Sequence, residues 1–535
     1  MTTDQAEGEI HEQTKEEWEM NITTSLTMNA TRQPDLMALN FEGKPYTYQE
    51  LNTEVNRLAN GLLREGIAKG DKVALFMKNS DAYVMAFFAV LKAGGVVVPV
   101  NYRLNAEEAG YLFGQSDAAY VFCDNEFESL VAEAKELDDL LHQVIVYPKA
   151  QEEAHLSWGE VLDDDRSEPK VEILPEDDAE ILYTSGTTGP PKGALFDHQR
   201  IVNVSTSFIL GTGVNHGDRL LHAAPFFHPS QLNLFLVTGV MLGIPQTILR
   251  EFAARDVLGA IQQDGCTVFF GLPDMYHALL EAPESAYDLG TVRKCMYGTD
   301  PMPNGLVARA MKFFGHEQFY NLCFLTEGGP GGVYLLPSEH AHKEGAGGKS
   351  MYMTHVRVVD EEMNDVAPGQ VGEFIMRGET IMKSYYNMPE ETKEAFRDSW
   401  LLTGDLATID EDGYITLVDR KSDRIISAGN NIYSIEIEQV LNRHPQVQEA
   451  ATVGIPEEEW GEIVGVVIVP KDGSPIDEEA LSEYLLEHLP HHKAPKKFRF
   501  ADELPRNASG KILKYQLREL HISEYTWFRH TFIER

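Results

Sequence analysis

The sequence has few cysteines and no segment typical of an exported protein. No two cysteines form a CxxC pair, which excludes a structural zinc site of the usual spacing and argues against a disulfide framework. The N-terminal stretch MTTDQAEGEIHEQTKEEWEM is acidic and lacks an apolar core, so we expect no signal peptide and a reducing, cytoplasmic location. The four cysteines are Cys123, Cys266, Cys295 and Cys323.

Long apolar runs are also missing. The most apolar stretch, residues 84–100, is interrupted by Lys92, Gly94, Gly95 and Pro99. This composition favours a buried helix followed by a strand over a membrane span. We therefore expect no transmembrane segment.

Positive charge is scarce. The chain has 45 Lys and Arg residues against 84 Asp and Glu residues, for a formal net charge of −39. Such a surface repels nucleic acid and anionic lipid, so any phosphate-binding site must be basic locally. Basic residues do gather at Lys192, at Arg420–Arg424 and between Lys493 and Arg499.

The pattern of apolar residues predicts an α/β fold with more than one domain. A chain of 535 residues is too long for one core. Helical periodicity alternates with short β-branched runs over the first 400 residues or so, which predicts parallel sheets covered by helices. Short strands between Val356 and Met376 predict a small distorted barrel. A compact α+β pattern follows Asp419–Asp423, where we expect a domain boundary.

The most informative segment is YTSGTTGPPKG, residues 183–193. It holds four serine and threonine side chains, three glycines and one lysine at the end of the strand-like AEILYT. Glycines let backbone amides turn toward an anion, while hydroxyls and a lysine add donors and charge. The segment therefore predicts a phosphate cradle, although it lacks the Gly-Lys-Ser/Thr triplet of the Walker motif. The alternative is an ordinary polar loop.

This segment resembles the phosphate loop of the AMP-forming adenylating enzymes, which include acyl-CoA synthetases, luciferases and peptide-synthetase adenylation domains. Five further family-like segments follow in the family order and extend the resemblance from about residue 38 to about residue 518. They are FFHPS from Phe226, TEGG from Thr326, LLTGDLA from Leu401, DRKSDRIISAGNNIYSIEIE from Asp419 and PRNASGKILK from Pro505.

The resemblance implies a large N-terminal domain, residues 31–421, and a small mobile C-terminal lid, residues 422–535, with a hinge near Ser422. Residues 1–30 would form an acidic extension. It also implies an ATP site and one Mg²⁺ ligand, Glu327, because a carboxylate suits Mg²⁺ held partly by phosphate oxygens. The implied nucleotide-binding residues are Thr184, Ser185, Gly186, Thr187, Thr188, Gly189, Lys192, Gly298, Thr299, Asp300, Cys323, Thr326, Asp405 and Arg420.

Within this set the resemblance assigns different tasks. Lys192 and the hydroxyls of residues 184–188 would grip the triphosphate, and Thr326 would contact the α-phosphate. Asp405 would accept the ribose hydroxyls, since a fixed carboxylate can take both protons, and Arg420 would be the second ribose contact. For Asp405 the alternative is a turn aspartate.

Lys511, in SGKILK, resembles the lysine that the lid carries into the adenylation site. A lysine suits this role because a flexible stem delivers a compact charge. The alternative for Lys511 is a solvated lysine in a basic tail, which is what we expect of its neighbour Lys514. The segment SAGNNIYS would line the CoA tunnel after the lid rotates, with Gly429, Asn430 and Trp460 as CoA-binding residues; partial packing is the alternative for Trp460.

The acyl pocket is where the sequence departs from its relatives. Many relatives carry Tyr-Gly-x-Thr-Glu, whereas this chain has Cys323, Phe324 and Leu325 before Thr326. Cysteine cannot stack on adenine like tyrosine, and Phe324 puts a ring where a glycine leaves space. His228 resembles the gate at the pocket mouth, with a buried core histidine as the alternative. Phe324 either points into the pocket or packs in the core.

The sequence therefore predicts an AMP-forming acyl-CoA synthetase. The substrate would be a carboxylic acid, which we expect to be a fatty acid. This acid would react first with ATP and then with CoA. Delivery of the acyl group to a separate carrier protein, a luciferase-like oxidase and a nucleotide-binding descendant without ligase activity are the alternatives. The chain ends shortly after Lys511, so we expect no fused carrier domain, and a homodimer is left open.

Overall fold

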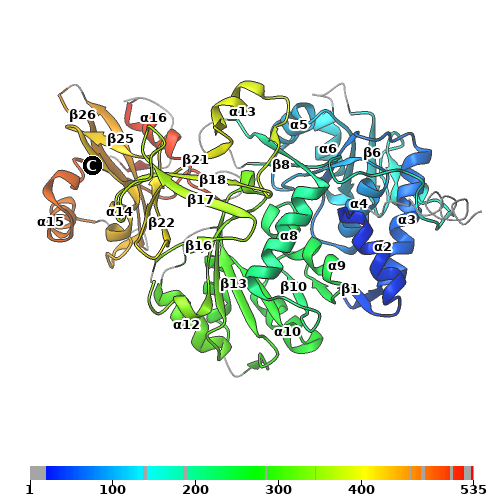
Figure 1. Ribbon diagram of the computed structural model, residues 1–535. Helices are drawn as coiled ribbons and strands as arrows, with labels where there is room; N and C mark the ends of the chain where they lie inside the picture. Colours follow the sequence, from blue (N-terminus) through cyan, green and yellow to red (C-terminus); the bar gives the residue numbers. More distant parts are fainter. Residues whose placement is uncertain are drawn as a thin grey trace, which may run out of the picture.

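The structure is a computed structural model, and it describes residues 20–135, 141–184, 190–283, 286–299, 302, 304–343, 345–457, 459–471, 476–506, 510–522 and 532–533. Four sheets are built from these residues, and the expected α/β fold is confirmed. Figure 1 shows the large N-terminal part on one side of the view and the small C-terminal part, with α14, α15 and α16, on the other.

The first sheet has eight described strands in the order β19-β9-β8-β4-β3-β5-β6-β7, and most neighbours in it are parallel. Its strands are β3 (Lys72–Phe76), β4 (Val96–Pro99), β5 (Ala118–Asp124), β6 (Gln143–Tyr147), β7 (Leu156–Ser157), β8 (Asp178–Tyr183), β9 (Gly193–Asp197) and β19 (Ser384–Tyr385). The helices of this part of the chain are α2 (Ile22–Arg32), α3 (Tyr48–Arg64), α4 (Asp81–Lys92), α5 (Ala106–Gln115), α6 (Glu128–Lys135) and α7 (Trp158–Val161).

The second sheet has nine described strands in the order β16-β15-β14-β13-β12-β10-β11-β1-β2. Its strands are β1 (Met37–Phe41), β2 (Lys44–Thr47), β10 (Leu220–His222), β11 (Gln246–Ile248), β12 (Val268–Gly271), β13 (Lys294–Gly298), β14 (Phe319–Phe324), β15 (Gly332–Leu335) and β16 (Lys349–Ser350). The helices here are α8 (His198–Thr212), a π-helix (Ser230–Val237), α9 (Thr238–Leu242), α10 (Ala254–Asp264), α11 (Pro273–Leu280) and α12 (Asn304–Phe314).

A five-stranded sheet forms the half-barrel expected around residues 356–376. It contains β17 (Thr354–Val359), β18 (Gly372–Gly378), β20 (Phe396–Arg397), β21 (Trp400–Ile409) and β22 (Ile415–Arg420), and helix α13 (Pro389–Ala395) precedes β20. The C-terminal sheet contains β23 (Ile425–Ser427), β24 (Asn430–Ile432), β25 (Val447–Glu457), β26 (Gly461–Pro470), β27 (Lys497–Ala501) and β28 (Phe532–Ile533). Its helices are α14 (Ser434–Leu441), α15 (Glu478–His488) and α16 (Lys514–Ile522).

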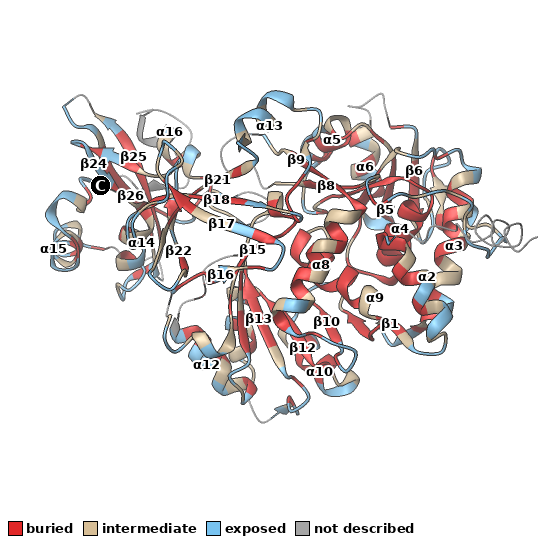
Figure 2. Ribbon diagram, in the orientation of Figure 1, coloured by how far each residue is buried: buried red, intermediate tan, exposed pale blue. Residues whose placement is uncertain are grey.

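Helix α8 joins the two large sheets through their cores. Its Ile201 and Val202 belong to one buried apolar cluster, while Val204 and Phe208 belong to the next. Figure 2 shows α8 and the strands around it as largely buried. One helix with two apolar faces therefore fixes the two sheets against each other, and the strand ends that carry the candidate site are held by both cores.

The apolar stretch at residues 84–100 is α4 followed by β4, as the sequence predicts. Lys92, at the end of α4, is 3% exposed, and its ammonium group is bound by Asn52, Asn56, Thr27 and Glu168. A buried charge is tolerated only when it is paired and hydrogen-bonded in this way. In the part of the chain that is described, no helix has the length and apolar character needed to cross a membrane.

Candidate active site

The candidate site lies where β8 and β9 approach the ends of β13 and β14 and the half-barrel strands β21 and β22. Tyr183 ends β8, and Lys192 precedes β9, so the phosphate loop joins two antiparallel neighbours. The backbone of Thr184 donates to the carbonyl of Lys192 at 3.0 Å, which closes the base of this loop. Residues Ser185, Gly186, Thr187, Thr188 and Gly189 lie outside the described residues.

Tyr385 connects the loop lysine to the candidate metal ligand. The Lys192 ammonium lies 5.1 Å from the centroid of the Tyr385 ring, and the Tyr385 hydroxyl donates to Glu327 Oε1 at 2.7 Å. Tyr385 reaches this place because β19 pairs with β9, with Tyr385 opposite Ala194. The backbone amide of Met382 also donates to the carbonyl of Glu327. Lys192 and Glu327, 135 positions apart in the chain, are thus arranged around one ring.

Sequence reasoning did not single out Tyr385. It is one of two adjacent tyrosines in the segment KSYYN, and nothing in that segment distinguishes the two. Burial raises its pKa, and the nearby Glu327 raises it further, so the hydroxyl stays a donor at neutral pH. Only the pairing of β19 with β9 reveals its place.

Asp405 and Arg420 face each other across β21 and β22. They occupy directly opposite positions of the antiparallel pair, and their side chains form an ion pair of 2.9 Å. Asp405 is buried, and burial raises the pKa of its carboxyl group, whereas Arg420 and Lys511 lower it. Glu327 also raises this pKa, which places its carboxylate in the same electrostatic environment. The two expected ribose contacts therefore lie together.

The charge of Lys511 lowers the pKa of groups on both sides of the site. Besides lowering the pKa of Asp405, its charge adds to burial in lowering the pKa of His228 to about 4. His228 is half-buried, and its Nδ1 is hydrogen-bonded to the Ser230 hydroxyl at 2.7 Å. His228 is therefore neutral at neutral pH, and the C-terminal part of the chain brings a cation close to both His228 and Asp405.

Gly298 and Thr299 mark the end of β13 beside β14. A Cβ at residue 298 would lie 2.1 Å from the carbonyl oxygen of Leu322, so only glycine fits there. Thr299 has a φ of +73°, which is a strained value for a β-branched residue. The next expected contact, Asp300, lies outside the described residues.

Cys323 and Phe324 point to opposite faces of β14, as neighbours on a strand must. Cys323 and Leu325 pack against the first apolar cluster, and the pKa of the Cys323 thiol is raised to about 12 by burial and by Asp405. Phe324 packs against the second cluster, which contains Tyr297, Phe270 and Phe235. Cys323 thus faces the expected ribose contacts, while Phe324 faces the core beside β12 and β13 and remains half-buried.

Two contacts tie the C-terminal helices to the end of the half-barrel. The Asp419 carboxylate accepts the amide and hydroxyl of Ser434, and the Lys514 ammonium donates to the same hydroxyl at 2.6 Å and to Glu438 at 2.7 Å. Arg518 donates to the Ser422 carbonyl at 2.7 Å. Lys514 is therefore an internal contact of this region rather than a solvated lysine, and the predicted hinge is bridged by α16.

The expected CoA-binding residues gather at a different place. Gly429 has a φ of +77° in the hairpin between β23 and β24, and Asn430 opens β24. The amide of Ala428 donates to the carbonyl of Trp460, whose ring is 40% exposed and lies under the Lys496 ammonium. Figure 2 shows β24 at the outer end of the C-terminal part, on the side away from α8. The structure thus brings Gly429, Asn430 and Trp460 together, at the end of the C-terminal part that lies away from α8.

The described residues hold no group of three or more His, Cys, Asp or Glu side chains suited to a metal ion. A single carboxylate at Glu327 nevertheless fits Mg²⁺, which keeps several waters and binds substrate phosphates. An anion grip at Lys192, a carboxylate for hydroxyl groups at Asp405 and a cation at Lys511 together suit phosphoryl chemistry on a nucleotide.

Comparison with known proteins identifies relatives over nearly the whole chain. A family model described as AMP-binding enzyme matches residues 26–386, and one described as AMP-binding enzyme C-terminal domain matches residues 436–511. A feruloyl-CoA synthase of an Amycolatopsis species is 35% identical over 491 residues, which cover 91% of this chain and 96% of that enzyme. A long-chain-fatty-acid–CoA ligase of Mycobacterium tuberculosis is 34% identical over 503 residues, covering 93% and 98%.

A solved structure has the same fold. The o-succinylbenzoate coenzyme A synthetase of Bacillus subtilis, in complex with ATP and a magnesium ion, superposes with a TM-score of 0.83 and 30% identity. The match covers 92% of this chain and 98% of that enzyme.

Proposed function

We propose that this chain activates an apolar carboxylic acid of the fatty-acid class in two half-reactions. The chain belongs to the AMP-binding enzyme family of adenylating enzymes and is an acyl-CoA ligase. The names of the three relatives described above refer to ferulate, long-chain fatty acids and o-succinylbenzoate. Sequence similarity to them therefore does not identify the acid that this chain activates. The apolar surroundings of Phe324 and the neutral His228 favour an acid whose body carries no charge.

The first half-reaction makes the acid reactive. A carboxylate oxygen attacks the α-phosphorus of ATP, pyrophosphate leaves, and an acyl-adenylate forms. In this proposal Lys192 holds the departing phosphates, Thr326 contacts the α-phosphate and Asp405 fixes the ribose. Lys511 neutralises charge between the acid and the α-phosphate. Mg²⁺ bound at Glu327 would supply charge stabilisation to the phosphates.

One observation carries this assignment. Lys511 comes from the C-terminal part of the chain, yet its charge influences His228 at the expected pocket mouth and Asp405 at the expected ribose site. His228 lies in the loop between β10 and the π-helix, whereas Asp405 lies on β21 of the half-barrel, so a cation that influences both would lie between acid and nucleotide. This supports an orientation of the C-terminal domain that serves adenylation.

The second half-reaction needs a different orientation. A CoA thiol must attack the acyl carbonyl, with AMP as the leaving group. The hairpin of β23 and β24, which carries Gly429 and Asn430, lies on the side of the C-terminal part away from α8 (Figure 2). We propose that rotation about the segment near Ser422 withdraws Lys511 and brings this hairpin and Trp460 to the CoA path. The domain boundary at residues 421–422 stays a prediction.

Replacing Glu327 with glutamine should weaken Mg²⁺-dependent activity more than acid binding. The amide keeps the size of the side chain but removes the charge that a divalent cation needs. We expect the Mg²⁺ concentration at half-maximal activity to rise at least about tenfold, as the loss of one charged contact implies. Steady-state rates across a Mg²⁺ titration measure this.

A matched control is Glu339→Gln. Glu339 also accepts a tyrosine hydroxyl at 2.7 Å, from Tyr414, but it was not assigned to the metal site. If Glu327→Gln keeps the parent Mg²⁺ requirement, or if Glu339→Gln changes it equally, Glu327 is not the metal ligand.

Replacing Phe324 with glycine tests whether the ring shapes the acyl pocket. If the ring closes the pocket, its removal should admit longer acids. Specificity should then rise at most about fourfold for each added methylene, which corresponds to ~0.8 kcal/mol of binding free energy. A panel of acids from acetate to palmitate, with aryl acids included, gives the profile of kcat/KM for parent and variant.

Phe252→Gly is the control, because Phe252 packs against the same apolar cluster from a loop. A longer preferred acid in Phe324→Gly alone supports the pocket role. An unchanged preference in both variants, with lower thermal stability, means that Phe324 is core packing. A parent preference for aryl acids would contradict the fatty-acid proposal while leaving the ligase class intact.

A further inference from the structure

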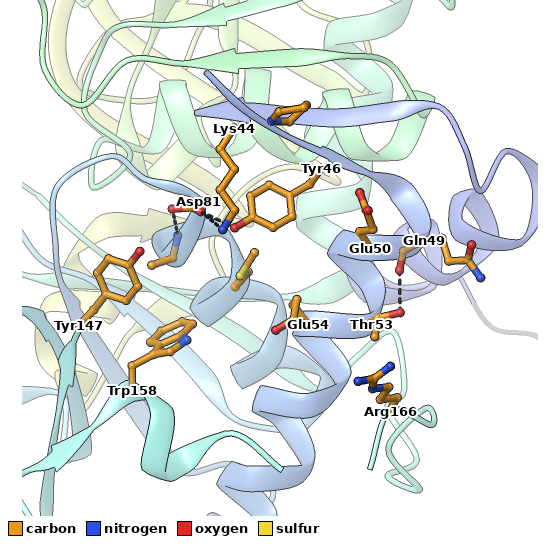
Figure 3. Close-up of a pocket in the computed structure, with 13 residues that line it drawn as sticks. Lys44, Tyr46, Gln49, Glu50, Thr53, Glu54, Asp81, Tyr147, Trp158 and Arg166 are labelled. Atoms are coloured by element: carbon orange, nitrogen blue, oxygen red, sulfur yellow. Dashed lines mark hydrogen bonds and ion pairs between the residues drawn. The ribbon is translucent and has the colours of Figure 1, made fainter. Parts of the chain in front are cut away.

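A cavity of about 720 Å³ lies in the N-terminal part of the chain, outside the candidate active site (Figure 3). It opens between β2, α3 and the first turn of α4, with the end of β6 and the start of α7 on the opposite side. None of the residues assigned above to ATP, acid or CoA lines it. Its walls include Lys44, Tyr46, Glu54, Asp81, Tyr147 and Trp158.

The position of the cavity in the sheet is one where ligands bind in α/β proteins. Strand β3 pairs in parallel with β4 on one side and with β5 on the other. The chain reaches β4 through α4 and then returns past β3 to β5, so the strand order reverses at β3. Crevices at the carboxyl ends of strands next to such a reversal are the usual ligand sites of open sheets. Asp81, soon after β3, and Tyr147, at the end of β6, lie at these ends.

Aromatic rings form two walls of the cavity and are held in place. The Tyr147 and Trp158 rings meet edge to face, with centroids 5.2 Å apart, and Phe122 supports Trp158 from behind at 5.8 Å. In Figure 3 the Tyr46 ring lies above Trp158, and the Glu54 side chain lies to the right of Trp158. Faces of tyrosine and tryptophan attract cations through the ring quadrupole.

Carboxylates outnumber cations among the side chains that line the cavity. Asp81 accepts the Tyr46 hydroxyl at 2.7 Å and its side chain is almost fully buried. The lining includes three carboxylates, Glu50, Glu54 and Asp81, against two cations, Lys44 and Arg166. Burial raises the pKa of Tyr46 and of Tyr147, and Asp81 raises both further. Glu54 is half-buried and pairs with Arg57 at 3.1 Å.

The chain's own lysine indicates which ligand fits. The Lys44 ammonium lies 4.5 Å from the centroid of the Tyr46 ring and 3.9 Å from Asp81 Oδ2. Yet the Lys44 side chain is 68% exposed, so an ion pair at this distance restrains it only weakly. The cavity thus already accepts one primary ammonium group, at its rim and on a flexible stem.

We propose that this cavity is a second binding site, which takes a small primary alkylammonium ion and binds it in competition with the Lys44 side chain. The ammonium group would lie between Asp81, Glu54 and the Tyr46 ring, and the alkyl body would lie against Trp158 and Met85. The net charge of −39 raises the local concentration of cations around this protein. A carboxylate or phosphate ligand would instead meet the excess of lining carboxylates.

Butylammonium is the probe that tests this site, with butyrate as its anionic counterpart. Saturation-transfer NMR on the full chain, titrated with each compound, gives the affinities. We expect saturable binding of butylammonium that saturating ATP does not displace, and no saturable binding of butyrate. Lys44→Met should tighten butylammonium binding about threefold to tenfold, because it removes the competing ammonium. Glu54→Gln should weaken it by a similar factor.

Lys69→Met is the matched control, since Lys69 forms its ion pair with Asp177 elsewhere on the surface. Lys44 is exposed, so Lys44→Met should fold like the parent, which a thermal melt verifies. Unchanged affinity in Lys44→Met, equal tightening in Lys69→Met, displacement by ATP, absence of saturable butylammonium binding or comparable binding of butyrate would each overturn the proposal.

Discussion

Replacing Lys511 with alanine is expected to slow formation of the acyl-adenylate by about 10²–10³-fold, or roughly 3–4 kcal/mol of transition-state stabilisation. The reason is that its ammonium group acts on both His228 and Asp405 and so lies where charge develops between acid and α-phosphate. Thioester formation from a supplied acyl-adenylate and CoA should stay within a few-fold of the parent rate. Acid-dependent pyrophosphate release measures the first step, and acyl-CoA formation from synthetic adenylate measures the second.

Two lysines of the same domain serve as controls. Lys471 is exposed just after the end of β26, and Lys471→Ala should leave both half-reactions unchanged. Lys514 is bound to Ser434 and Glu438, so Lys514→Ala should lower thermal stability without a preference for one half-reaction. Equal losses in the two half-reactions of Lys511→Ala would show that the lysine does not serve adenylation alone.

Replacing Asp405 with alanine should lower kcat/KM for ATP by about 10²–10⁴-fold. A buried carboxylate that accepts two hydroxyl protons makes two charge-assisted hydrogen bonds, each worth about 1.5–3 kcal/mol. The matched control is Asp410→Ala, which removes a carboxylate paired with Lys343 just beyond the end of the same strand, β21. A loss confined to kcat/KM for the acid, with normal ATP kinetics, would contradict the ribose role.

The ion pair of Asp405 with Arg420 predicts a pH dependence of the activity. Asp405 must be ionised to accept ribose hydroxyls, so activity falls as the pH drops below its folded-state pKa. Burial raises that pKa, while Arg420 opposes the rise. Arg420→Lys should therefore keep the acid limb of the kcat/KM profile close to its parent position, and Arg420→Ala should move it to higher pH. An acid limb that stays in place in Arg420→Ala means that another group titrates there.

The sequence motifs predicted residues that the fold brings together over long distances. Asp405 and Arg420 each follow from a local segment, and their opposition across β21 and β22 agrees with a common task. Thr326 and Glu327 follow β14 in a short 3-10 turn, where Glu327 accepts the hydroxyl of Tyr385. These motifs can be recognised in the sequence because each needs a fixed spacing of neighbouring residues.

Other features could not be read from the sequence because they depend on pairing between distant strands. Tyr385 meets Glu327 only through the β19–β9 pair, and Lys514 meets Glu438 only after α14 and α16 have both packed on β25. The side of β14 that Phe324 occupies follows from strand register, which a single sequence does not determine. The cavity around Tyr46 and Trp158 combines segments more than 100 residues apart, and none of them carries a motif.

In the proposed reaction, one chain carries out two separable half-reactions, with adenylation first. A single-turnover experiment with enzyme, ATP, Mg²⁺ and the preferred acid, but without CoA, tests it most directly. We expect a burst of about one pyrophosphate per active site, dependent on the acid, and an enzyme-bound acyl-adenylate that becomes acyl-CoA and AMP when CoA is added. Pyrophosphate release that begins only after CoA is added would contradict it.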